Sequence, residues 1–524
     1  MVNLKLADIR NRISQIKADV SRESASAFVY LFGILCCLPL VIHNGYYDIT
    51  ETKTVCFAVS AGVCLVLFVL FGGDVFAEKV KKTVKRQQKL LPTDTAFLLF
   101  FVSFAVSALL SDYRKAVFLG QNGRYQGVLT VLAYLAVYFA VSLRFKKSAV
   151  ITAGAALAFS AVCIFAALNA FGFDPLGIYL ELNDKNKAQF LTTIGNVNFY
   201  GSYVCLLFPT VIFGFCVSQK KAFTVFFALC ASAGAAGAVF TASESFAVGF
   251  AAALAVMPVF LFDNRKALRR FASGGIFLIW FMKLILLIYE KRADTLVKPS
   301  VLLKTFLNPA FAAAVTVLLA ALLILTRGGR QAPAKLKKIY LIAAAALVFL
   351  IIAAFVAANT FLKNSDLGAL EQYLKITDSW GTNRGRTWKY CIDKFGDYSF
   401  GEKLFGKGPE TLSMLTDNSG MYKTKHLDQA HNEFLHYLMT VGIAGLASYL
   451  ALIGGTVRAV LKELKNEPLA QALLCGCIGY WAQSFFNIAQ PFSTPAMFAF
   501  IACIAGMVTC NAGAAPERKK NGSH

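Results

Sequence analysis

The chain has 524 residues, of which 57% are hydrophobic and 15% are charged. A soluble protein is excluded, because soluble domains carry about 25% charged residues and many apolar runs here reach the roughly 17–25 residues that span a bilayer. The formal net charge of +23 does not predict nucleic-acid binding, since the basic residues lie mostly in connectors on one side of the expected membrane.

Fourteen apolar spans follow one another along the chain. They predict an all-α, polytopic integral membrane protein with about 14 transmembrane helices. A membrane barrel would instead need alternating segments of about 10 residues. The expected spans are residues 27–42, 54–72, 95–110, 126–142, 149–168, 198–217, 222–241, 245–262, 273–289, 309–326, 339–362, 432–456, 469–487 and 495–512.

One long polar interval divides these spans and defines the expected domains. Residues 1–362 are expected to hold about 11 spans, and residues 363–431 to form one extracytoplasmic loop that carries the candidate site. Residues 432–512 are expected to add about 3 spans, and residues 513–524 to form a cytoplasmic tail.

The orientation follows from the basic residues. Lys and Arg number 31 in the connectors on the side of the N-terminus and 10 in the short connectors on the opposite side. Because the more positive side of a membrane protein is cytoplasmic, both termini are predicted to be cytoplasmic and residues 363–431 to be outside. The first 26 residues are polar, and no small-residue cleavage site follows, so no cleavable signal peptide is expected.

His431 is the first candidate for chemistry. It lies where the polar interval becomes the span 432–456, and the pKa of an imidazole suits it to remove a proton from a hydroxyl group. The alternative is an ordinary interfacial histidine. Asn432 and His436 are candidates for contacting the substrate, although His436 is about 140° further around the helix and is expected to pack inward. Neither His431 nor its neighbours show the spacing of a known metal motif, so no metal or other cofactor is expected.

Three arginines are candidates for binding phosphate. Arg384 and Arg386 lie in the sequence NRGRTWK, and Arg124 lies in the outward loop QNGRY. Guanidinium groups bind phosphate oxygens in pairs and can stabilise a pyrophosphate leaving group without metal. A solvated basic turn is the alternative for each of them. Trp388 is a further candidate for contacting a sugar ring, and Glu244 lies at an outer helix junction where it could contact the substrate.

Three patches of the sequence resemble the O-antigen ligase and O-antigen polymerase superfamily of bacterial membrane proteins. Residues 194–209 are similar to its Gly-Asn-x-Asn-aromatic helix start, and residues 385–388 with 404–412 are similar to a second family patch. The most specific patch is His-Asn at 431–432, then nine residues, then Gly-Ile-Ala-Gly at 442–445. It resembles the ligase signature His-Asn/Ser/Gln, nine residues, Gly-x-x-Gly.

The resemblance implies a metal-independent glycosyltransferase in the bacterial cytoplasmic membrane. Such enzymes move a glycan from an undecaprenyl-pyrophosphate-linked donor to a hydroxyl group of a glycan, lipid or protein acceptor at the outer leaflet. The family histidine, here His431, then acts as the general base, and the family arginine before Trp, here Arg386, contacts the pyrophosphate.

Two positions depart from the family pattern. The ligase signature continues Thr-Gly where this chain has Leu446 and Ala447, and many members have Ser-Arg where this chain has Ser243 and Glu244. Arg124 or Arg384 could replace the missing arginine. The alternative function is a membrane transporter of an anion or a lipid-linked sugar, and its best argument is Lys283, a charge inside the span 273–289.

Overall fold

The structure of the protein is a computed structural model that describes residues 21–85, 89–120, 123–179, 182–292, 294–328, 334–416 and 427–520. Within these residues, ten helices are long and apolar enough to cross a membrane, and two shorter helices are also apolar. The ten are α3 (Ile49–Val84), α4 (Pro92–Leu110), α7 (Ala149–Ala170), α9 (Val197–Val217), α10 (Lys221–Ala238), α11 (Glu244–Leu261), α12 (Arg265–Glu290), α15 (Ala334–Asn359), α20 (Glu433–Arg458) with its extension η5 (Ala459–Glu463), and α22 (Thr494–Lys520). The two shorter ones are α6 (Val128–Arg144) and α14 (Pro309–Leu325).

The prediction of a polytopic helical membrane protein is therefore confirmed. Twelve of the fourteen expected spans coincide with these apolar helices. Both of the others are helical but fall outside the set that is long and apolar enough. Residues 27–42 form α2 (Ala25–Phe32) and η2 (Gly33–Cys37), and residues 469–487 form α21 (Pro468–Ser484).

Local chemistry distinguishes these two segments from the other spans. Pro39 cannot continue the helix that begins with α2, because proline lacks an N–H donor. The carbonyl oxygens freed at Leu38 and Pro39 accept hydrogen bonds from the buried Nζ of Lys53 at 2.6 and 3.1 Å. Helix α21 carries the buried polar side chains Gln483 and Ser484, which it can hold because it packs against protein on several sides.

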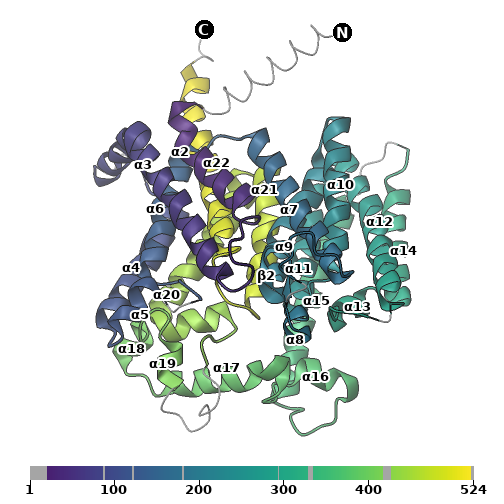
Figure 1. Cartoon of the computed structure of the whole chain (residues 1–524). Coiled ribbons are helices and arrows are strands. Elements are labelled where there is room, and N and C mark those ends of the chain that lie inside the picture. Colours follow the sequence, from purple (N-terminus) through teal and green to yellow (C-terminus); the bar gives the residue numbers. More distant parts are fainter. Residues whose placement is uncertain are drawn as a thin grey trace.

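The helices form a core and a periphery. In the apolar windows of α9 and α22, 78% and 83% of the residues are buried, against 17% in α12 and 6% in α15. Helix α9 packs against α10, α11 and α21, so these helices form the centre of the bundle. Helices α12 and α14 lie to one side (Figure 1). Their exposed apolar faces, and those of α15, suit contact with lipid.

Helix starts follow the sequence closely. The side chain of Asn196 accepts a hydrogen bond from the N–H of Asn198 and caps α9, and Ser148 caps α7 in the same way. Asn308 caps α14, and Pro309 occupies its first turn, where the missing N–H costs nothing.

The described part of the polar interval, residues 363–416 and 427–431, contains several short helices. They lie along the edge of the molecule opposite the end of α22, and include the longer α17 (Figure 1). Their bounds are η3 (Gly368–Leu370), α16 (Glu371–Leu374), α17 (Trp380–Gly396), α18 (Phe400–Phe405) and α19 (Leu412–Thr416).

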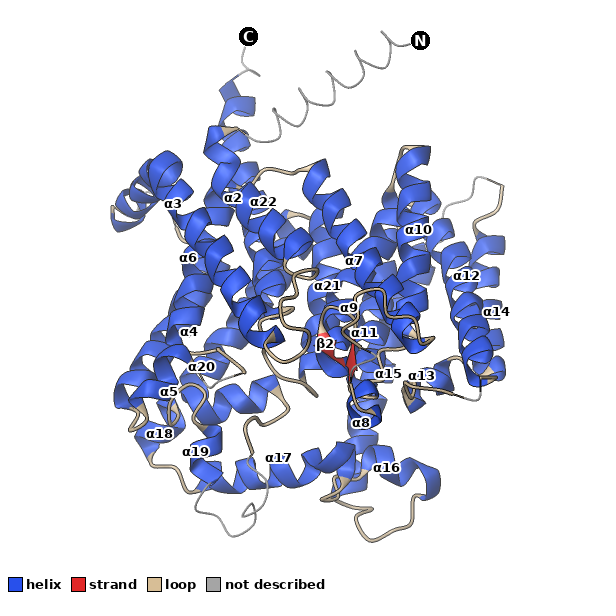
Figure 2. Ribbon diagram, viewed as in Figure 1, coloured by secondary structure: helices blue, strands red, loops and turns tan. Residues whose placement is uncertain are grey.

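Other short elements occupy the remaining connectors. The structure is helical almost throughout, and one pair of short antiparallel strands precedes α9 (Figure 2). The strands pair Phe190 with Asn196 and Leu191 with Gly195. These connector elements are η1 (Arg22–Ser24), α5 (Arg114–Leu119), α8 (Asp184–Lys187), β1 (Phe190–Leu191), β2 (Gly195–Asn196) and α13 (Val301–Phe306).

Candidate functional site

The candidate site is built around the turn that leads into α20. His431 has φ 49°, in the left-handed region that a non-glycine residue enters at a cost of roughly 1–3 kcal/mol. The next residue, Asn432, is buried and caps the helix, since its Oδ1 accepts the N–H of Leu435 at 3.0 Å. Because of this tight turn, the imidazole of His431 does not continue the line of the helix.

Trp388 holds the backbone immediately before this turn. Its indole N–H donates to the carbonyl oxygen of Ala430 at 3.1 Å, and its side chain is only 7% exposed. The rings of Trp380 and Phe486 pack against it, with centroids 5.2 and 6.1 Å away. Trp388 is thus a buried support for the His431 turn, whereas the sequence had offered it as a surface for a sugar ring.

Helix α17 separates the two arginines of the NRGRTWK sequence. Residues four apart share a helix face, and residues two apart do not. Arg384 therefore lies on the face of the buried Trp388 and is half-buried, whereas Arg386 is 46% exposed. The Nε of Arg386 lies 3.9 Å from Oδ2 of Asp378, and the Nζ of Lys389 lies 2.8 Å from Oδ1 of the same carboxylate.

Gly385 explains why α17 can begin this way. A Cβ atom at this position would lie 1.9 Å from the carbonyl oxygen of Thr377, so no other residue fits there without a shift of the backbone. Thr382 and Asn383 have positive φ values and bend the start of the helix. The bend and the glycine together bring Arg384 toward the turn that carries His431.

Arg124 reaches the site from a separate loop between α5 and α6. A Cβ atom on Gly127 would lie 2.5 Å from the backbone N of Gly120, so these two glycines allow the loop to close tightly. The Nε of Arg124 donates to Oδ2 of Asp428 at 3.0 Å, and Nη2 of Arg124 contacts the same oxygen. The guanidinium also lies over the ring of Phe199, 5.9 Å from its centroid, at the start of α9.

The charges around His431 are of both signs. Burial lowers the pKa of His431 to about 4, and the positive charges of Arg384 and Arg124 act in the same direction. The carboxylate of Asp428 acts in the opposite direction and raises this pKa, whereas His436 lowers it slightly further. At neutral pH the imidazole is thus uncharged, which is the form that can accept a proton.

The two partners of His431 have shifted pKa values of their own. Burial lowers the pKa of Arg384, while the negative charge of Glu244 opposes that shift. Burial alone would raise the pKa of Asp428, but Arg124 and His431 outweigh it and the pKa is lowered. The lowered pKa keeps Asp428 charged at neutral pH, and Arg384 is charged because a guanidinium is not deprotonated in proteins. Charges in such a partly buried site interact strongly.

Glu244 is exposed, and its carboxylate supports a neighbouring helix. Its carboxylate accepts hydrogen bonds from Ser300 Oγ at 2.7 Å and from the N–H groups of Val301 and Leu302 at 2.8 and 2.9 Å. These are the unpaired donors at the start of α13. The residue that replaces the family arginine thus fixes α13 and places a negative charge near Arg384.

His436 lies inside the bundle, as its spacing predicted. It is 5% exposed, and its Nε2 lies 3.4 Å from Oε1 of Glu410. Glu410 also accepts a hydrogen bond from Gln429 at 2.9 Å. The pair His436–Glu410 therefore anchors the segment that leads to His431, and Glu410 is a buried acid that the sequence reading did not identify.

Glu433 is a second buried acid that sequence reasoning missed. Its carboxylate accepts hydrogen bonds from the hydroxyl groups of Tyr449, Tyr480 and Tyr437 at 2.7, 3.1 and 3.3 Å. These bonds tie the start of α20 to α21. An acidic residue in the first turn of an apolar span is itself a signal, because a charge at that depth needs partners.

The glycines of the two later family patches make one backbone contact. Gly442 interrupts α20 with φ 71°, and a Cβ atom there would lie 2.4 Å from the backbone of Leu404. A Cβ on Gly406 would lie 2.3 Å from the backbone of Thr440. The N–H of Gly408 donates to the carbonyl oxygen of Thr440 at 2.9 Å. The glycines thus let the segment after α18 dock directly on α20.

The first family patch has a comparable structural role. The side chain of Asn198 accepts a hydrogen bond from Ser243 Oγ at 2.8 Å, and its backbone carbonyl accepts one from Asn487 at 2.9 Å. These contacts join the start of α9 to α11 and to the end of α21. Phe199, from the same patch, lies under Arg124.

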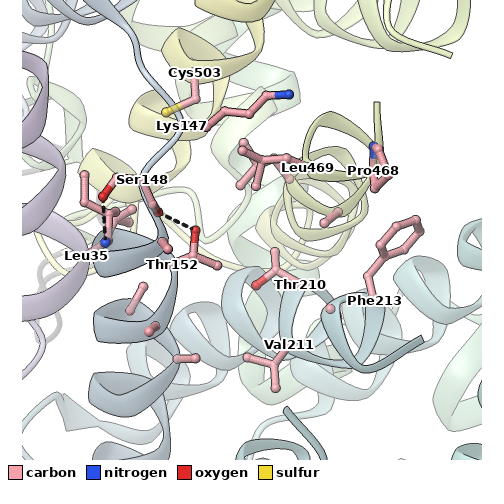
Figure 3. A pocket seen from close by; sticks show the side chains of 18 of the residues that line it. Leu35, Lys147, Ser148, Thr152, Thr210, Val211, Phe213, Pro468, Leu469 and Cys503 are labelled. Carbon is pink, nitrogen blue, oxygen red and sulfur yellow. Dashed lines mark hydrogen bonds between the residues drawn. The ribbon is translucent and has the colours of Figure 1, made fainter. Parts of the chain in front are cut away.

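Two cavities of several hundred Å³ lie away from these residues. One, of about 400 Å³, lies between the starts of α7, α10 and α21, and its wall includes Lys147, Ser148, Thr210 and Leu469 (Figure 3). A second, of about 470 Å³, is lined mostly by apolar side chains of α9, α11, α12 and α14. Neither is lined by His431 or by the arginines around it.

The side chains that the structure describes do not gather into a metal-binding group. Among them, no three His, Cys, Asp or Glu residues could hold one ion. His426, which the sequence places near His431, lies outside the described residues. The cationic groups that surround His431 are guanidinium groups, which suit an anionic ligand.

The comparison with known families covers the later part of the site. Residues 305–450 match the Wzy_C family model, described as O-antigen ligase, and this stretch contains Arg384, Trp388, Asp428 and His431. The resemblance found in the sequence is thereby confirmed, and the family is one of glycosyltransferase-type enzymes. No curated protein sequence matches the chain.

Proposed function

With residues 305–450 forming an O-antigen ligase domain, we propose that this chain is a membrane glycosyltransferase that polymerises or ligates glycans. Its donor is a glycan on a polyprenyl pyrophosphate, and its acceptor is a hydroxyl group of a glycan, lipid or protein at the outer leaflet. The observation that carries the proposal is the half-buried cluster of Arg124, Arg384 and His431, where two cations flank one uncharged imidazole.

His431 serves as the general base in this proposal. It takes the proton from the acceptor hydroxyl while the acceptor oxygen forms a bond to the anomeric carbon of the donor. The bond from that carbon to the pyrophosphate oxygen breaks, and its electron pair stays with the pyrophosphate. The left-handed turn, the Asn432 cap and the Trp388 hydrogen bond keep the imidazole in place during this step.

Arg384 and Arg124 stabilise the leaving pyrophosphate. Charge develops on the leaving group in the transition state, and donors fixed nearby in a poorly solvated site stabilise it without reorganising. The family resemblance assigns this role to Arg386, but the geometry favours Arg384, since Arg386 lies on the exposed face of α17 beside Asp378. No metal is required, because the guanidinium groups supply the positive charge.

The proposed topology has 14 crossings, with both termini in the cytoplasm and the polar interval outside. The bias of basic residues supports it. A Ser365→Cys substitution, at an exposed position, should react with a membrane-impermeant thiol reagent in intact cells. A Gln219→Cys substitution, exposed in a connector on the opposite side, is the matched control and should react only after permeabilisation. Reversed labelling of the two sites would contradict the orientation.

The direct test of function uses the purified protein in lipid nanodiscs. It is incubated with an oligosaccharide linked to undecaprenyl pyrophosphate, with and without added acceptor glycans. Products are separated by gel and identified by mass spectrometry. Chain growth or transfer that depends on His431 supports the proposal, and an intact donor under all conditions would refute it.

Transport is the competing function, and the position of its best residue weakens it. Lys283 lies on α12, a peripheral helix with only 17% of its apolar window buried, and it lines neither of the two cavities described above. A transport path would need polar groups along a continuous interior route. The nanodisc assay separates the two functions, because a transporter leaves the donor chemically unchanged.

A further inference from the structure

We propose that Asp428 is a positioning residue that makes His431 a better base only when the donor is bound. Before donor binding, Asp428 is paired with Arg124. When Arg124 turns to the pyrophosphate, the released carboxylate faces His431 and favours the protonated imidazole. The inference rests on the proposed function, because it requires an anionic pyrophosphate donor at this site.

The first observation is the ion pair itself. Asp428 and Arg124 are 304 residues apart in the chain and are joined by contacts from Nε and Nη2 of Arg124 to a single oxygen, Oδ2. Neither side chain is fully buried: that of Arg124 is 22% exposed and that of Asp428 is 38% exposed. A guanidinium held at only one carboxylate oxygen and open to solvent has donors left for a second anion.

The second observation is the balance of charges around His431. Arg384 comes from α17, Arg124 from the loop before α6, and His436 from α20, and all three oppose protonation of the imidazole. Asp428 is the acidic group that favours it. While Arg124 neutralises Asp428, the remaining positive charge and burial keep His431 a weak base, and base strength governs the rate of proton removal.

Donor binding changes each of these charges in the same direction. A pyrophosphate brings negative charge to Arg384 and Arg124, and guanidinium groups bind phosphate oxygens at least as readily as a carboxylate. The positive electrostatic potential at His431 falls, and Arg124 no longer neutralises the carboxylate of Asp428. The imidazole then accepts the acceptor proton more readily at the moment when the anomeric carbon is in place.

The cycle closes when the products leave. The acceptor oxygen has bonded to the anomeric carbon, and the electron pair of the broken bond lies on the pyrophosphate. As the polyprenyl pyrophosphate departs, Arg124 returns to Asp428 and His431 loses its proton to solvent. The ion pair seen in the structure is therefore the resting state.

The kinetic test compares Asp428→Asn with Asp378→Asn, an exposed acid of the same polar interval that also pairs with basic residues. Asp428→Asn should lower kcat about 10-fold, a small part of the roughly 10²–10⁴ that general-base catalysis contributes. The donor KM should stay the same or fall, because Arg124 no longer has an internal competitor. Asp378→Asn should change neither value.

The pH profile separates this role from a merely structural one. In the wild type, kcat should decline on the acid side at a higher pH than kcat/KM, because kcat reports the donor-bound enzyme. In Asp428→Asn the separation between the two declines should become clearly smaller than in the wild type, because only the charge of the donor still acts on His431. If the ion pair only ties two loops, the variant would raise KM and lower thermal stability, and the separation between the two declines would remain; that result overturns the proposal.

A binding experiment reports on the switch without turnover. The protein is labelled with ¹⁵N-histidine, the His431 signal is assigned with a His431→Gln variant, and the titration midpoint is measured with and without undecaprenyl pyrophosphate. Binding of the lipid is measured in parallel by native mass spectrometry. On binding of the lipid, the pH midpoint of the His431 titration should rise in the wild type and should rise less in Asp428→Asn.

The outcomes distinguish the inference from the function beneath it. If the lipid binds and the wild-type midpoint stays where it was, the role of Asp428 is refuted while the donor assignment stands. If the lipid does not bind, the donor assignment fails, and the inference fails with it.

Discussion

Two clusters of charge in this protein contain the same kinds of residue and occupy different surroundings. One joins Arg384 to His431 and to the pair Arg124–Asp428, and it is half-buried. The other joins Arg386 and Lys389 to Asp378, and its side chains are 46%, 51% and 59% exposed. Helix α17 contributes to both, through opposite faces.

From this difference we expect that surroundings, more than residue type, decide which arginine contributes to chemistry. An exposed ion pair contributes about 0–1 kcal/mol, because water screens it and its side chains remain mobile. A charge in a partly desolvated site interacts several times more strongly. The half-buried cluster can therefore stabilise a developing charge, whereas the exposed cluster can mainly hold the surface of the polar interval.

Removing His431 should separate the two clusters most clearly. We expect His431→Ala to reduce transfer by about 10²–10⁴, the usual contribution of a general base. The variant should still insert and fold, since α20 is capped by Asn432 and anchored by Glu433. Transfer is measured at matched protein level with the lipid-linked donor. Transfer close to that of the wild type would remove the base assignment.

The two arginines of α17 provide the next comparison. Arg384→Ala should lower kcat/KM for the donor about 10- to 100-fold, the equivalent of the roughly 1.5–3 kcal/mol in a charge-assisted hydrogen bond. Arg386→Ala should cost at most a few-fold, as expected for an exposed pair. Arg384→Lys should restore only part of the loss, because an ammonium cannot reproduce the two-pronged contact.

The opposite result would change the assignment in a definite way. A large loss in Arg386→Ala with a small loss in Arg384→Ala would return the pyrophosphate contact to the residue that the family resemblance names. It would also mean that α17 turns when the donor binds, because Arg386 lies beside Asp378 in the donor-free protein.

The outcome for α17 illustrates what the sequence could and could not predict. The resemblance names Arg386 as the pyrophosphate contact, whereas our proposal from the geometry names Arg384. Arg384 lies four residues before Trp388 and shares its helix face, whereas Arg386 lies two residues before it and does not. This spacing would have distinguished the two arginines if the burial of Trp388 had been known. That burial depends on Trp380 and Phe486, and Phe486 follows α21, far along the chain from Trp388. Such distant packing is not visible in a single sequence.

The fold was more accessible than the site for a physical reason. Length and hydropathy are local properties, and they identified twelve spans. The role of Asp428 depends on a partner 304 residues away, and the role of Glu410 depends on His436. Short-range patterns gave the helix ends and the position of His431, whereas the ion pairs that tune His431 needed the tertiary structure.

Helix α20, which follows His431, is also held by the close backbone contact between Gly442 and Leu404. Gly442→Ala should destabilise the protein by roughly 1–3 kcal/mol or more, because φ 71° with extended ψ suits glycine and the new Cβ would meet Leu404. Gly454→Ala is the matched control on the same helix, with open space around the position, and should be neutral or slightly stabilising. Thermal unfolding in detergent measures both. Equal melting temperatures would show that the segment after α18 can move away from α20 at little cost.

Chelation of metal should have the smallest effect. In the half-buried cluster the positive charges belong to Arg384 and Arg124, and Arg124 already occupies Oδ2 of Asp428. A divalent ion at the same place would have to displace a guanidinium and would find too few oxygen ligands among the described residues. Transfer should therefore be unchanged in EDTA, measured against a sample with added Mg²⁺ or Mn²⁺. Loss of transfer in EDTA, with recovery on addition of either ion, would mean that the arginines do not carry the leaving group by themselves.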